Sequence, residues 1–167
     1  MKHTKSTAKL FTLPALIGGG VALTAALLTR LTVGSPLAVV HKLEAFLILP
    51  PLWLMSLLWL FSFLLMGAAA GHLLASPMGS AKREAYLWRG STFMVLAVVF
   101  SLVWYTLLFG KLFLLPSWIC LLLSAAAAFA CALSWRQVAW GAAAAALGFA
   151  LWQITLFLLQ FAVLLHT

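Results

Sequence analysis

The chain has almost no acidic residues: aspartate is absent, and Glu44 and Glu84 are its only carboxylates. Both glutamates stand beside basic residues at the ends of apolar stretches, which is typical of solvated charges at a membrane interface. A mechanism built on paired carboxylates therefore has no support, and we expect no enzyme activity. With 66% hydrophobic residues, 7% charged residues and a mean hydropathy of +1.17, the 167 residues cannot form a water-soluble surface.

Metal-ligating residues are also scarce and scattered. None of the four histidines stands at metal-ligand spacing from another histidine or from a cysteine. His72 falls near the end of an apolar stretch, where it could approach a haem iron, although a histidine there is more often an interfacial polar group. Cys120 and Cys131 would lie about 16 Å apart along one helix, which is too far for a disulfide and favours two free thiols.

Long apolar runs are what the chain has in abundance. A helix rises about 1.5 Å per residue, so about 20 apolar residues cross a hydrocarbon layer about 30 Å thick. Strand-like alternation is absent, which argues against a barrel. Five stretches are long enough: 10–29, 45–75, 91–109, 114–135 and 137–165. We predict an all-α fold, with residues 1–167 forming one transmembrane domain, a bundle of five helices.

The first stretch has an alternative interpretation. Lys2, Lys5 and Lys9 precede an apolar run, and residues 22–26 include small side chains of the kind found at cleavage sites. This pattern also fits a cleaved signal peptide. We expect the segment to be retained as the first membrane span.

The basic residues predict the orientation of the chain. Five spans place the two termini on opposite sides of the membrane, and seven basic residues gather on the N-terminal side against three on the other. The positive-inside rule then puts the N-terminus in the cytoplasm, in what we expect to be a bacterial cell membrane. The net charge of +8 fits basic loops beside anionic lipid, and we expect no nucleic-acid binding. The seven are Lys2, Lys5, Lys9, Lys82, Arg83, Arg89 and Arg136; the three are Arg30, Lys42 and Lys111.

Small residues cluster in several predicted helices. Gly67 and Gly71 form a GxxxG step, and alanine or glycine fills 125–128 and 141–146. Small side chains let helices approach closely in lipid, where hydrophobic attraction between helices is weak. Such faces can pack within one bundle or between two copies. We predict a homodimer, with the Gly67/Gly71 step as the first candidate contact.

The eight tryptophans fall into two groups by position. One group lies near the ends of the predicted spans, where an indole suits the membrane–water interface without a further function. These are Trp88, Trp118, Trp135 and Trp140. The second group lies further inside, where a buried indole N–H needs an acceptor or a polar ligand. These are Trp53, Trp59, Trp104 and Trp152.

The second predicted helix carries a recognisable pattern of large side chains. Trp59, Phe63 and Met66 share one of its faces, a stripe that more often serves helix packing. Several indoles converging from different helices would instead form a flat, apolar ligand cavity. The stripe belongs to a longer pattern that begins with a double proline. Its residues are Pro50, Pro51, Trp53, Trp59, Phe63, Met66, Gly67 and Ala69.

This pattern resembles the second helix of the TspO/MBR family, the tryptophan-rich sensory and translocator proteins. The third predicted helix, "FSLVWYTLLFG", is similar to that family at Trp104, Phe109 and Gly110. The fifth is similar at Arg136, Trp152, Leu159 and Gln160. The family's polar positions are replaced here by Ala97 and Ser101 on the third helix, and Ile48, Gly148 and Phe149 replace its Trp and Pro-Tyr. We therefore expect a more apolar pocket.

The resemblance implies a five-helix protein that binds a planar hydrophobic ligand between its helices. That ligand would be a tetrapyrrole such as protoporphyrin IX or haem, or a sterol, under a first loop at about 31–49. The alternative is a structural or assembly protein that has lost the pocket, its aromatic residues serving only for packing. The site residues that the resemblance implies are Trp53, Trp59, Phe63, Ser101, Trp104, Phe149, Trp152 and Gln160.

Overall fold

The computed structural model describes residues 13–33, 51–77 and 79–164, and it confirms an all-α bundle. Its five long helices are each long and apolar enough to cross a membrane, so the chain is an integral multi-pass membrane protein. Their bounds are Leu13–Val33 (α1), Leu52–Leu74 (α3), Ala81–Tyr105 (α4), Leu114–Trp135 (α5) and Trp140–Leu164 (α6). A π-helical turn, Thr106–Gly110 (η1), ends α4.

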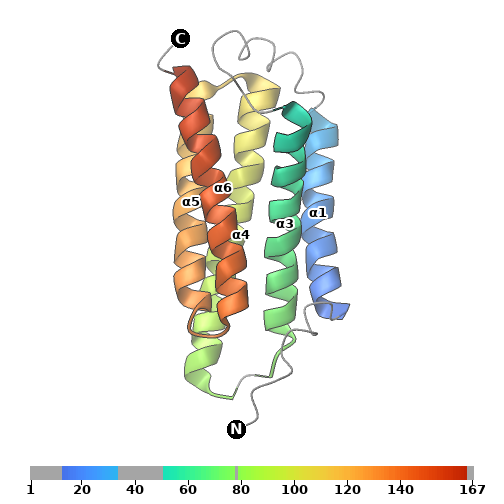
Figure 1. Ribbon diagram of the computed structural model, residues 1–167, viewed down its shortest axis with the longest axis vertical. Coiled ribbons are helices and arrows are strands. Elements are labelled where there is room, and N and C mark those ends of the chain that lie inside the picture. The colour runs from blue at the N-terminus through green and yellow to red at the C-terminus, as the bar shows by residue number, and fades with distance from the viewer. Residues whose placement is uncertain (1–12, 34–50, 78, 165–167) are drawn as a thin grey trace.

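The helices run alternately up and down, so that α1 begins at the end of the bundle opposite to the one where α6 finishes (Figure 1). In the packing order, α1 lies on α3, α3 meets α6, and α5 lies between α6 and α4. Direct contact between α3 and α4 is sparse by comparison. The bundle thus consists of an α1–α3 pair and an α4–α5–α6 group. The packing is loose where α1 and α3 face α4, and we name this boundary the α3–α4 seam.

Two helix starts follow from local chemistry. The prolines before α3 lack an N–H donor, so the helix begins after Pro51 without losing an internal hydrogen bond. The α4 helix begins after Ser80, whose side-chain oxygen accepts a hydrogen bond from the Arg83 backbone N–H. Glu84 in its first turn is favourable beside the positive end of the helix dipole.

The helix that contains the third predicted span extends well before that span. The helix starts at Ala81, ten residues before the predicted Ser91, because its charged first turns form a helix outside the apolar stretch. The fourth span is confirmed at 114–135, and the fifth begins at Trp140 instead of Gln137. Predicted residues 10–12, 45–50 and 165, and the loop around Lys42, Glu44 and Ile48, lie outside the described residues.

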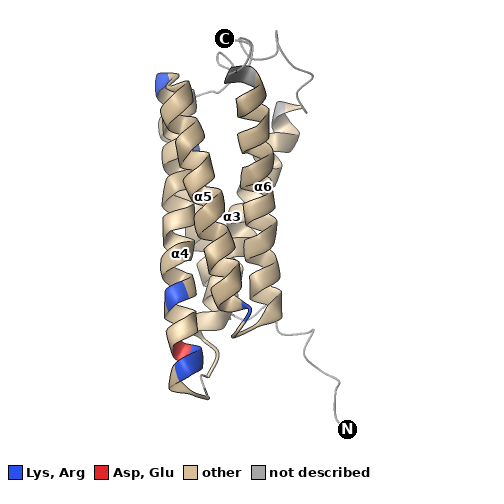
Figure 2. Cartoon of the chain, turned by 90° about the vertical axis from the view of Figure 1, so that its left-hand side faces the viewer, with Lys and Arg blue, Asp and Glu red and all other residues tan. Residues whose placement is uncertain are grey.

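Among the described residues, the basic side chains favour one end of the bundle (Figure 2). Lys82, Arg83 and Arg89 stand on the first turns of α4, and Arg136 follows α5 at the same end. The Arg83 guanidinium also donates a hydrogen bond of 2.7 Å to the Val138 carbonyl oxygen, which fixes the turn between α5 and α6.

Gly67 and Gly71 pack inside the bundle and are not free for a second copy. A Cβ on Gly67 would overlap the Gly18 carbonyl oxygen, and one on Gly71 would overlap that of Pro14. The step therefore lets α1 approach α3 closely. The intramolecular interpretation of this step is confirmed, and its assignment as a dimer contact was wrong because α1 already covers it.

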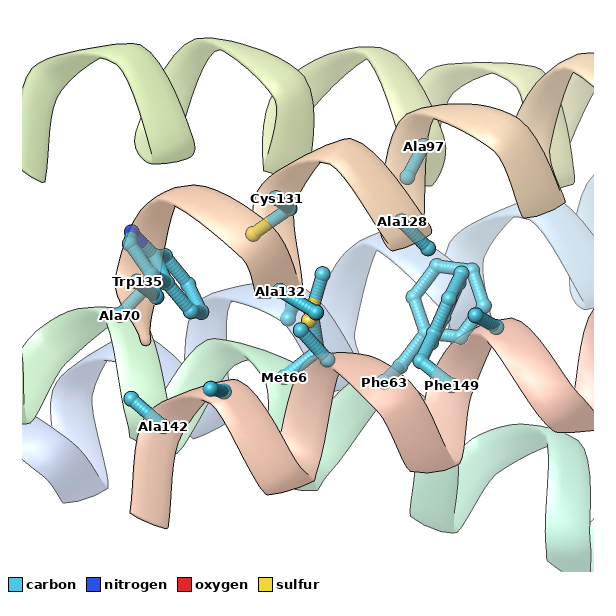
Figure 3. Close-up of a cluster of buried hydrophobic side chains, with 14 of the residues drawn as sticks. Phe63, Met66, Ala70, Ala97, Ala128, Cys131, Ala132, Trp135, Ala142 and Phe149 are labelled. Atoms are coloured by element: carbon cyan, nitrogen blue, oxygen red, sulfur yellow. The ribbon is translucent and has the colours of Figure 1, made fainter. Parts of the chain in front are cut away.

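Trp135 was wrongly assigned to the interface belt. It is fully buried, and its indole occupies the space that a side chain on Gly90 would need. Trp88 and Trp140, by contrast, are exposed, and Trp118 is half-buried and stacked on Phe157. In the core, the buried side chains run from Trp135 to Phe63 and Phe149 (Figure 3).

Candidate functional site

The described residues enclose a cavity of about 40 Å³ on the α3–α4 seam. It lies toward the end of the bundle where α1 and η1 finish, since Gly110 there faces Val33. Every helix except α5 contributes to its wall. The lining residues are Arg30 from α1, Met55, Ser56 and Trp59 from α3, Trp104, Tyr105 and Phe109 from α4 and η1, and Leu156 from α6.

Four of the eight lining residues are aromatic. The Trp59 indole and the Tyr105 ring are stacked, with centroids 4.8 Å apart and planes inclined by 21°. Phe109 lies 4.7 Å from Tyr105, and it meets Trp104 edge-on at 6.0 Å. These separations are in the range of favourable aromatic pairs, each worth about 0.5–1.5 kcal/mol beyond area burial. The rings form one connected cluster across the seam.

A π-helical turn follows directly after two of the rings that line the cavity. Trp104 and Tyr105 are consecutive, yet both are buried. The wider turn of η1 follows them and brings Phe109 against both rings. The turn closes with Leu112 at a φ of 56°, a conformation that is rare for a bulky side chain. Single π turns occur frequently at functional sites.

A buried hydrogen-bond group lies behind Trp59. Its indole Nε1 donates to the Ser101 hydroxyl at 3.3 Å, and the Gln153 amide donates to the same oxygen at 3.0 Å. Ser101 and Gln153 are both fully buried. The Gln153 carbonyl oxygen has no donor among the described residues. The Gln153 side-chain amide of α6 thus lies in the core, beside Ser101 of α4.

A second group fixes Trp104. Its Nε1 donates to the Gln160 side-chain oxygen at 2.9 Å, and the Gln160 amide donates to the Leu114 carbonyl oxygen at 2.8 Å and to the Ser117 hydroxyl. Gln160 thus has partners at both ends of its amide. It joins α4, α5 and α6 beside the cavity.

The structure separates the predicted site residues into three sets. Trp59 and Trp104 line the cavity, and Ser101 and Gln160 bond to their indoles from behind. Phe63 and Phe149 lie deeper in the core, 5.5 Å apart and edge-to-face. Trp53 and Trp152 lie away from the cavity. Trp53 is 65% exposed at the start of α3, so its expected place inside the bundle was wrong.

Trp152 faces a different hollow, a groove of about 330 Å³ between α3 and α6. Its indole N–H has no acceptor among the described residues. A third and larger groove, about 620 Å³, is lined mainly by small and aliphatic residues of α1 and α3, with Met94 and Val98 of α4. All three hollows border α3, and two of them lie on the α3–α4 seam.

Sequence reasoning missed six of the residues that line the cavity, and it missed Gln153 behind it. The six are Arg30, Met55, Ser56, Tyr105, Phe109 and Leu156. Tyr105 and Phe109 stand in the same "VWYTLLFG" run as Trp104, and their i, i+4 spacing was the available signal. Arg30 stood in a predicted interfacial segment and looked like an ordinary solvated charge. No periodic pattern in the sequence pointed to Gln153, because it is an isolated amide side chain within an apolar stretch.

Nothing among the described residues holds a metal. No group of three or more metal-ligating side chains occurs in the described part of the chain. His72 lies on α3 roughly 20 Å beyond Trp59 at the usual helical rise, toward the opposite end of the bundle. It cannot reach an iron placed in this cavity. Cys120 and Cys131 are free thiols, as predicted.

Comparison with known proteins does not extend this description. No family model, no curated protein and no solved structure matches the chain.

Proposed function

We propose that this chain is a membrane-embedded binding protein, a sensor or carrier, for a planar hydrophobic ligand. A tetrapyrrole such as protoporphyrin IX or haem is the favoured ligand, and a sterol is the second choice. One observation supports this most strongly: Trp59, Trp104, Tyr105 and Phe109 converge from two helices around one cavity. Flat, polarisable rings with few polar groups suit a flat apolar ligand.

The resemblance to the TspO/MBR family supports the same function. Trp59 and Trp104 belong to the patterns that carry that resemblance, and both line the cavity. Ser101 and Gln160, expected to contact the ligand, are hydrogen-bonded to these indoles. We therefore assign them to positioning the two rings.

Ligand binding requires the cavity to widen. Drug-sized ligands occupy pockets of about 300–1,000 Å³, compared with about 40 Å³ here. The Tyr105 ring covers one face of Trp59, so a planar ligand must displace it. Opening along the sparsely packed α3–α4 seam would admit the ligand and keep the α1–α3 and α4–α5–α6 groups intact.

The small cavity also favours the second candidate function. If the rings pack only against one another, the chain is a structural or assembly protein of the membrane. Titration of the purified protein with protoporphyrin IX, followed by tryptophan fluorescence, distinguishes the two functions. Saturable quenching supports ligand binding; a linear loss without saturation supports the structural role.

We also propose how the chain is oriented in the membrane and how it assembles. Of the described basic residues, Lys82, Arg83, Arg89 and Arg136 gather at the end where α1 begins. The positive-inside rule places that end in the cytoplasm, and we propose a bacterial cell membrane as its location. We also propose a homodimer, whose contact must use a surface other than Gly67 and Gly71.

A further inference from the structure

We infer that Arg30 recognises an anionic group on the ligand, so that the site selects a planar hydrophobic acid over its neutral counterpart. This inference rests on the proposed function and names the ligand class for the same cavity. Among the described residues that line the cavity, Arg30 alone carries a charged side chain. The remaining lining residues are aromatic or aliphatic apart from Ser56.

Nothing among the described residues pairs with the Arg30 guanidinium; residues 34–50, which include Glu44, lie outside the described part of the chain. No described residue accepts a hydrogen bond from its guanidinium, although that group carries five donors. Glu84 is the single carboxylate of the described residues, and it stands on the first turn of α4 at the opposite end of the bundle. Arg30 is half-buried as a residue and borders an apolar wall, and a cation there attracts an anion more strongly than a fully solvated one because solvent screens it less.

The size of the cavity fits this assignment. A water-sized group needs about 10–15 Å³ of such space. The cavity, at about 40 Å³, therefore has room for roughly three groups of that size. A carboxylate has three heavy atoms. The cavity can therefore hold the acidic group of a ligand against Arg30, while the ring system occupies the space that opens when Tyr105 moves.

A simpler role for Arg30 is that of a helix-end cation. It stands in the last turn of α1, where a positive charge is favourable beside the helix dipole and beside lipid head groups. Lys111 has the same general setting, just after η1 at the same end of the bundle, but it is exposed and does not line the cavity. Lys111 is therefore the matched control for charge alone.

The test compares protoporphyrin IX, which carries two carboxylates, with its neutral dimethyl ester. Both are titrated by tryptophan fluorescence into the full-length protein in phosphatidylcholine nanodiscs. We expect wild type to bind the acid at least about tenfold more tightly than the ester, as for a charge-assisted pair. Arg30→Gln should abolish this preference by lowering the affinity for the acid more than the affinity for the ester, whereas Lys111→Gln should retain it. Arg30→Lys, which keeps the charge, should retain part of it.

Four results would overturn the inference, and only the last of them would also remove the proposed function. Equal affinity of wild type for acid and ester would do so and leave the proposed function standing, and this arm needs no variant to fold. If Lys111→Gln lost the preference for the acid just as Arg30→Gln does, the preference would come from general surface charge and not from Arg30. Disappearance of the preference when phosphatidylglycerol is added to the nanodiscs would assign Arg30 to a lipid head group. Saturable binding of neither compound would remove the proposed function and the inference together.

Discussion

The Tyr105 ring lies flat against the Trp59 indole, with the two centroids 4.8 Å apart. Phe63 lies at the same distance from Trp59, tilted by 57°. Both neighbouring rings thus cover the Trp59 indole of α3 in this structure. Under the proposed function, a planar ligand would reach the Trp59 ring only after Tyr105 moves, and this would affect the rate of ligand association.

Tyr105→Leu should speed ligand association several-fold, because a flexible aliphatic side chain leaves the Trp59 ring less covered. Stopped-flow quenching with protoporphyrin IX measures this rate. Tyr86→Leu is the matched control, since Tyr86 is half-buried nearer the start of α4 and does not line the cavity. Equal association rates in wild type and Tyr105→Leu would show that Tyr105 does not limit access.

Joining α1 to η1 should prevent the seam from opening. A Cβ on Gly110 would lie 3.5 Å from the Val33 Cγ1 atom, so the two positions are neighbours and a cysteine pair can be placed there. We expect the oxidised Val33→Cys/Gly110→Cys variant to lose porphyrin binding, and reduction of the same sample to restore it. Full binding by the oxidised protein would exclude this seam as the route of access.

Gly90→Ala should destabilise the bundle by about 1–3 kcal/mol, because the added Cβ overlaps the Trp135 indole in a filled core. Thermal unfolding in detergent measures the change. Gly141→Ala is the control, since a Cβ there meets nothing within 4 Å. Similar melting temperatures for wild type and both variants would contradict the close packing of Gly90 against Trp135.

The two buried glutamines should behave differently when replaced by leucine. Gln160→Leu leaves the Trp104 N–H without its acceptor, which should cost about 1–3 kcal/mol of stability. Gln153→Leu should cost less, because the Gln153 carbonyl oxygen already lacks a partner among the described residues. Comparison of the two melting temperatures checks this order, and a greater loss for Gln153→Leu would reverse our assignment of the two groups.

The sequence predicted the helices better than the site. Membrane thickness sets the length of an apolar run, so the five spans and the bounds of α5 could be read directly. Hydropathy could not find the start of α4, because its first turns are charged and helical. The i, i+4 pattern could not show that the consecutive residues Trp104 and Tyr105 are both buried, since that depends on how α4 packs against its neighbours. Trp135 was misplaced for a related reason: only tertiary packing sets its indole over Gly90.

Trp59 tests the central claim, that the aromatic cavity binds a planar ligand. Porphyrin affinity and melting temperature should be measured on one Trp59→Leu preparation, beside Trp53→Leu as a control, because Trp53 is exposed on the same helix. We expect Trp59→Leu to weaken binding about tenfold, the equivalent of one lost aromatic stacking contact, and Trp53→Leu to bind as wild type does. Normal porphyrin affinity together with a lowered melting temperature in Trp59→Leu would mean that the indole serves only to pack the bundle.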